Sequence, residues 1–135
     1  NTICYSTSRL NDIKVNGTSI GLTTTYNVNS TDVVEFDVNY YSGTASYGEN
    51  LFLNNQNLVS IELGNGITYV GTQMCAGCTS LQEIDLSGGT LNSNCSFSQM
   101  FEEVPTSCTI YVKDQVSKNL LTNADNTHTY TIKTI

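Results

Sequence analysis

Two stretches of six residues decide the fold: Leu58-Val59-Ser60-Ile61-Glu62-Leu63 and Leu81-Gln82-Glu83-Ile84-Asp85-Leu86. Each has polar residues at its third and fifth positions and apolar residues at its fourth and sixth, as a strand with one buried face requires. The second stretch follows the first after 23 residues, and Ile110-Tyr111-Val112 follows Ile84-Asp85-Leu86 after 26. A short strand that recurs at an interval in the low twenties is typical of a leucine-rich solenoid, whose strands stack in parallel.

The residues around these strands resemble the BspA-type leucine-rich repeats of bacterial surface proteins. Residues 57–71 look like one unit of that family, and residues 74–81 look like the start of the next. There are departures, because Cys75 stands where the family usually has an aromatic residue, and residues 91–97 lack its Ile-x-x-Ile-Gly element. The resemblance implies an α/β leucine-rich-repeat fold dominated by β structure, a short solenoid of about two and a half repeats. It also implies an N-terminal β module and a C-terminal cap of one helix and one strand.

The first fifty residues are predicted to form the β module. Asn16-Gly17 lies between short apolar stretches and indicates a tight hairpin, because both central positions of a type I′ turn need a positive φ. Apolar and polar residues alternate from Val34 to Tyr40, which is typical of a half-buried strand. A further strand is expected over residues 23–28, where Thr, Tyr and Val predominate.

The domain organisation follows from these elements. We expect residues 1–50 to pack on residues 51–135, so that the two parts form one compact unit. In the second part, a helix is expected over residues 113–124, with Asp114 as its N-cap. An edge strand is expected over residues 129–135 and would close the open end of the solenoid.

Stacking of the strands would create an outward face that can bind a partner. Residues one interval apart would lie about 4.8 Å apart on neighbouring strands. The candidate binding residues form two rows: Ser60, Glu83 and Thr109 in one, and Glu62, Asp85 and Tyr111 in the other. Such a face would suit sugar hydroxyls, a basic patch of a protein or weakly held Ca²⁺, with the tyrosine as the aromatic anchor. The alternative is an ordinary hydrated face whose like charges keep the protein soluble.

Composition limits the classes of function. The net charge is −7 with only five Lys and Arg residues, which argues against nucleic-acid binding because that needs a basic footprint. No apolar stretch approaches the roughly 20 residues that a membrane span needs. We therefore predict a non-enzymatic interaction module of a bacterial cell-surface or secreted protein, located outside the cell. Its partner would be a protein or glycan, and we predict no catalytic residue, no cofactor and no metal site.

Three motifs could carry chemistry and are interpreted as structural. Cys75-Ala76-Gly77-Cys78 matches a redox or zinc motif, and a zinc ion would need two more ligands from Cys95, Cys108 or His128. We expect most of the five cysteines to be buried thiols. The Gly-x-Ser-x-Gly match around Ser19 lies in the predicted hairpin rather than before a helix. The adjacent carboxylates Glu102 and Glu103 are expected in a solvated turn.

A second hypothesis belongs to a different class of protein. Charged residues are only 13 % of the chain, and its Ser-, Thr- and Asn-rich surface is common in virion fibres as well as in adhesive modules. The alternative is therefore a structural or assembly protein, such as a phage virion decoration or fibre subunit. That alternative implies a stable homo-oligomer, whereas the interaction module is expected to be a monomer.

Overall fold

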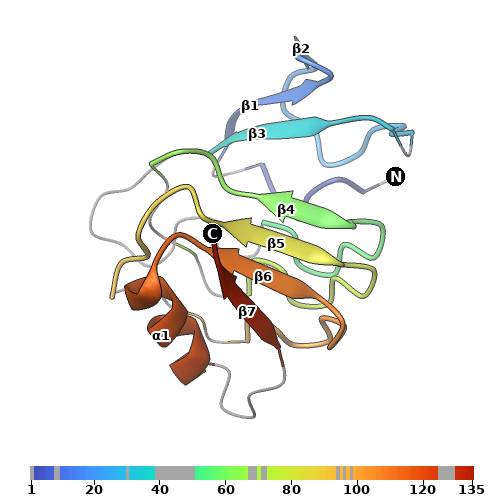
Figure 1. Ribbon diagram of the computed structural model, residues 1–135. Helices are drawn as coiled ribbons and strands as arrows, with labels where there is room; N and C mark the ends of the chain where they lie inside the picture. Colours follow the sequence, from blue (N-terminus) through green and yellow to red (C-terminus); the bar gives the residue numbers. More distant parts are fainter. Residues whose placement is uncertain are drawn as a thin grey trace.

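The structure is a computed structural model. It describes the following residues: 2–7, 10–29, 31–38, 51–66, 70, 73–93, 95, 97, 99–124 and 130–135. Among them are two separate sheets and one helix (Figure 1). The antiparallel sheet lies beside one end of the parallel sheet, and the helix lies near the other end.

The antiparallel sheet has three strands in the order β2-β1-β3, with bounds Leu10–Val15 for β1, Thr18–Ser19 for β2 and Val34–Val38 for β3. The predicted hairpin is confirmed: Asn16 and Gly17 join β1 to β2 with φ of 51° and 84°. The Asn16 side chain also fixes the turn, because its amide donates to Asp32 Oδ1 at 2.9 Å and its oxygen accepts from the Val33 amide at 2.9 Å.

The parallel sheet has four strands in the order β4-β5-β6-β7. Their bounds are Ser60–Glu62 for β4, Glu83–Leu86 for β5, Thr109–Val112 for β6 and Thr131–Thr134 for β7. Helix α1, Gln115–Ala124, connects β6 to β7. Two parallel neighbours need such a crossover, because a tight turn can join only antiparallel strands.

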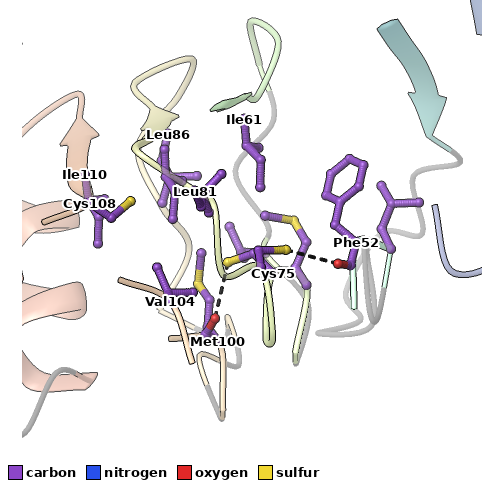
Figure 2. Packing of buried hydrophobic residues seen from close by; sticks show 14 of the residues in the cluster. Phe52, Ile61, Cys75, Leu81, Leu86, Met100, Val104, Cys108 and Ile110 are labelled. Carbon is purple, nitrogen blue, oxygen red and sulfur yellow. Dashed lines mark hydrogen bonds between the residues drawn. The ribbon is translucent and has the colours of Figure 1, made fainter. Parts of the chain in front are cut away.

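The core lies behind the parallel sheet. Alternation along the strands turns every second side chain inward, and the central row consists of Ile61, Ile84, Ile110 and Ile132. Buried residues from the turns before the strands, such as Phe52, Cys75 and Met100, form the opposite wall of this core (Figure 2). The rings of Phe36 on β3 and Phe52 pack edge to face at 5.1 Å between centroids, so one apolar cluster serves both sheets.

The predicted fold class, a leucine-rich-repeat solenoid of about two and a half repeats, is wrong. The structure is a small mixed α/β domain with an antiparallel and a parallel sheet. The interval in the low twenties correctly indicated parallel strands, but such strands also occur in mixed domains. The strand expected to close the sheet instead extends it, because β7 pairs in parallel with β6 after the α1 crossover.

The remaining elements of the prediction have mixed outcomes. The predicted helix is confirmed as α1, with Asp114 capping it by accepting the Ser117 amide at 2.9 Å. The strand expected over residues 23–28 is absent, and within that stretch only Thr25 forms an isolated bridge, to Thr2. Tyr40 and the predicted boundary at residue 50 lie outside the described residues.

Candidate binding face

The outward face of the parallel sheet exists because the strands alternate strictly. Ile84 is completely buried, whereas Glu83 before it is exposed and Asp85 after it is half-buried. The same alternation leaves Ser60 and Glu62 on β4 exposed. On β6 it leaves Thr109 and Tyr111 half-buried. The face is therefore polar throughout, although the same strands supply the core on their other side.

The six predicted residues are brought together in two rows. Register places Ser60 beside Glu83 and Glu83 beside Thr109, and it places Glu62 beside Asp85 and Asp85 beside Tyr111. These pairings are as predicted. That the rows bind a partner stays a prediction.

Sequence reasoning missed the residues that β7 adds to this face. In β7, Thr131 pairs with Thr109 and Lys133 pairs with Tyr111, so each row continues across all four strands. Both residues are exposed. The signal was available, because Tyr130 and Ile132 pack on the core and therefore set the residues between and after them on the outward face.

Charge is distributed unevenly over the face. The carboxylates of Glu62, Glu83 and Asp85 lie on β4 and β5, whereas Lys133 is the basic residue on β7. The face therefore presents an acidic side and a basic side, with Tyr111 between them.

Asp85 is held in place by the turn that follows β5. Its Oδ1 accepts the Ser87 amide at 2.9 Å and the Ser87 hydroxyl at 2.5 Å. An aspartate that binds the backbone two residues ahead closes an Asx turn. Asp85 therefore has a structural role as well as a place in the face.

The Cys-x-x-Cys motif lies in the core rather than at a surface. The Cys75 thiol donates to the Met100 carbonyl at 3.2 Å, and the Cys78 thiol donates to the Phe52 carbonyl at 3.1 Å (Figure 2). Burial raises the pKa of both thiols, that of Cys78 to about 11. Burial also raises the pKa of Cys108 to about 11, with a smaller contribution from Glu83. These thiols are protonated at neutral pH and act as hydrogen-bond donors, which favours the structural interpretation over a reactive thiolate.

The expectation of mainly buried thiols is confirmed. All five cysteines are free, four are buried and Cys95 is half-buried. In the part of the chain that the structure describes, no group of three or more His, Cys, Asp or Glu residues is placed to hold a metal ion. This applies to the three carboxylates of the face, which had been considered for Ca²⁺. His128 lies outside the described residues.

The other two motifs have ordinary structural roles. Ser19 lies in β2 and its hydroxyl donates to Asp12 Oδ1 at 2.6 Å. No helix follows in residues 20–29, so the context of a nucleophile elbow is missing there. Glu102 and Glu103 are both exposed in a turn, as expected.

A second polar face lies on the antiparallel sheet. Asp12, Lys14, Glu35, Phe36 and Asp37 line a shallow depression of about 190 Å³ there. Asp12 pairs directly with Asp37, and Lys14 pairs with Glu35. This face offers a matched control for experiments on the parallel sheet.

No family model, curated protein or solved structure matches this chain. Among the described residues, no helix is long and apolar enough to cross a membrane.

Proposed function

We propose that this domain is a non-enzymatic binding module that holds a protein partner against the outward face of the parallel sheet. The single observation that carries the proposal is the pair of polar rows, which continues in register across β4, β5, β6 and β7. The same strands present a closed apolar core on their other side. A partner would therefore meet eight polar side chains on four neighbouring strands.

The chemistry of the face favours a protein with basic side chains over a glycan. Glu62 and Glu83 are exposed carboxylates, and Lys or Arg side chains of a partner would form charge-assisted hydrogen bonds with them. Tyr111 would be the anchor, because a half-buried tyrosine offers both an apolar ring and a hydroxyl. Tyr111 is the only aromatic residue in the two rows, whereas sugar-binding faces gain from stacking on several rings.

The face is built on a rigid support. The isoleucine row behind it is buried in the core, with Ile84 and Ile110 fully inaccessible. The Ser87 hydrogen bonds hold Asp85 at the end of β5. A preorganised face loses little conformational freedom on binding, and this lowers the cost of association.

A location at the bacterial cell surface, or secretion from the cell, is part of the same proposal. It rests on the resemblance of residues 57–71 and 74–81 to BspA-type surface proteins. The alternative of an assembly or virion subunit predicts a stable oligomer, so native mass measurement separates the two.

The test is a binding screen against extracellular proteins and a glycan array. The variant Glu62→Ala/Glu83→Ala/Tyr111→Ala removes side chains of both rows and leaves Asp85 to hold its turn. The control variant Lys14→Ala/Glu35→Ala/Asp37→Ala removes a similar number of groups from the antiparallel sheet. We expect binding to a basic protein that the first variant loses and the control keeps. Binding that both variants retain, or binding to glycans alone, would contradict the proposal.

A further inference from the structure

Among the described residues, no strand pairs with the outer edge of β7. β7 is last in the order β4-β5-β6-β7, so β6 is its only neighbouring strand among the described residues. The Ile135 amide donates to the Val112 carbonyl of β6 at 2.9 Å. Because backbone groups alternate in direction along a strand, the amides and carbonyls of Ile132 and Thr134 point away from β6. Neither residue forms a hydrogen bond through these groups to another described residue.

The four existing strands show what a fifth strand would have to carry. The central inward row is isoleucine on every strand: Ile61, Ile84, Ile110 and Ile132. Ile132 at the end of this row is only partly buried. A neighbour with an apolar residue at that level would cover it and continue the core row.

Lys133 indicates which side chain a strand added beside β7 would carry on its outward face. On its inner side Lys133 stands beside Tyr111, and on its outer side no strand is present among those described. A carboxylate opposite a lysine on adjacent strands is stabilising, whereas two like charges directly opposite are destabilising. If β7 paired antiparallel with β7 of a second copy, with Ile132 opposite Thr134, the two Lys133 side chains would face each other. The edge therefore disfavours that self-pairing and favours an acidic neighbour.

We propose that the edge of β7 receives an extended segment of another polypeptide, which adds to the sheet as a parallel fifth strand. The segment carries an apolar residue beside Ile132, an acidic residue beside Lys133 and a hydroxyl residue beside Thr131. Backbone groups of Ile132 and Thr134 form the hydrogen bonds to the segment. The side chains beside Thr131, Ile132 and Lys133 give the selectivity, as in other cases of strand addition. This edge shares Thr131 and Lys133 with the face of the proposed function, whereas Thr134 lies outside the two rows, so a variant at Thr134 tests the edge alone.

The probe is a synthetic peptide with end groups blocked and the sequence of residues 57–63 of this chain, Asn-Leu-Val-Ser-Ile-Glu-Leu. It contains the Ser-Ile-Glu pattern that β4 contributes at the same three levels. Titration into the intact protein, followed by amide chemical shifts, should give saturable binding with a dissociation constant below about 1 mM. The shifts should be largest at Thr131–Ile135.

Two variants make the test specific. Thr134→Pro removes an amide that points away from β6 and leaves the hydrogen bonds to β6 intact, and proline is tolerated at edge strands. This variant should reduce the affinity for the peptide about tenfold or more. Lys133→Glu should weaken the binding about fivefold, and a peptide with Lys in place of its Glu should restore it. Thermal melts establish that both variants are folded.

The outcomes are decisive in both directions. Loss with Thr134→Pro together with restoration by the charge-swapped peptide would support strand addition at β7. No saturable binding by the wild-type protein would overturn the proposal, as would binding that Thr134→Pro leaves unchanged. Concentration-dependent dimerisation that Thr134→Pro abolishes would also overturn it, because the edge would then serve a second copy of the chain.

Discussion

Replacing one core residue of β5 should cost far more stability than replacing its outward neighbour. Ile84 is fully buried between Ile61 and Ile110, whereas Glu83 is exposed. Ile84→Ala removes three carbon atoms, worth about 2.4 kcal/mol at about 0.8 kcal/mol each. A residual cavity of about 50 Å³ adds about 1 kcal/mol, so the expected loss is about 3.5 kcal/mol. Glu83→Ala should change the free energy of unfolding by no more than about 0.5 kcal/mol.

Urea denaturation followed by far-UV circular dichroism measures both effects. With a slope of about 2 kcal/mol per molar urea, Ile84→Ala should lower the midpoint by about 1.7 M. Glu83→Ala should lower it by less than about 0.3 M. Equal shifts would refute the assignment of Ile84 to the buried face and of Glu83 to the outward face, because adjacent residues of a strand point to opposite faces and only one of them can lie in the core.

Three further predictions concern groups outside the face. Asp114 accepts hydrogen bonds from Thr90 and Ser117, which lower its pKa. The stability that Asp114 contributes is present above the pKa of the unfolded state and is lost as pH falls through the lower pKa of the folded state. Asp114→Asn should therefore destabilise the protein at pH 7 and match wild type in acid melts near pH 2. The pKa of Cys78 is raised from 9.0 to about 11, so its contribution to stability is complete below pH 9 and is lost as pH rises toward 11. In Cys78→Ala, the midpoint of urea denaturation should therefore fall less between pH 9 and pH 11 than in the wild type. The Tyr130 hydroxyl lies 2.7 Å from the Val104 carbonyl, and Tyr130→Phe should cost about 1 kcal/mol in a thermal melt.

Local patterns predicted β4, β5 and β6 and their register, because alternation and a fixed interval determine which residues can be neighbours. The Asn16-Gly17 turn and helix α1 were predictable for the same reason, since turn and cap chemistry act over a few residues. The burial of most of the cysteines was also predictable, because free cysteine is among the most buried residue types.

What the sequence did not reveal depends on contacts between distant segments. β7 follows a helix and alternates imperfectly, so the match of Thr131-Ile132 to Thr109-Ile110 after 22 residues was overlooked. A strand was expected there, but missing its parallel pairing with β6 left Thr131 and Lys133 out of the candidate face. Leu58 matches Leu81 in sequence, yet only Leu81 is fully buried, because burial depends on the neighbouring segments of each turn.

The most direct test of the central claim is to map where a partner captured in the binding screen contacts the protein. Amide chemical shifts of the labelled domain are measured with and without that partner. We expect the largest changes on β4, β5, β6 and β7, centred on Glu62, Glu83 and Tyr111. Changes centred instead on Lys14, Glu35 and Asp37 of the antiparallel sheet would contradict the claim.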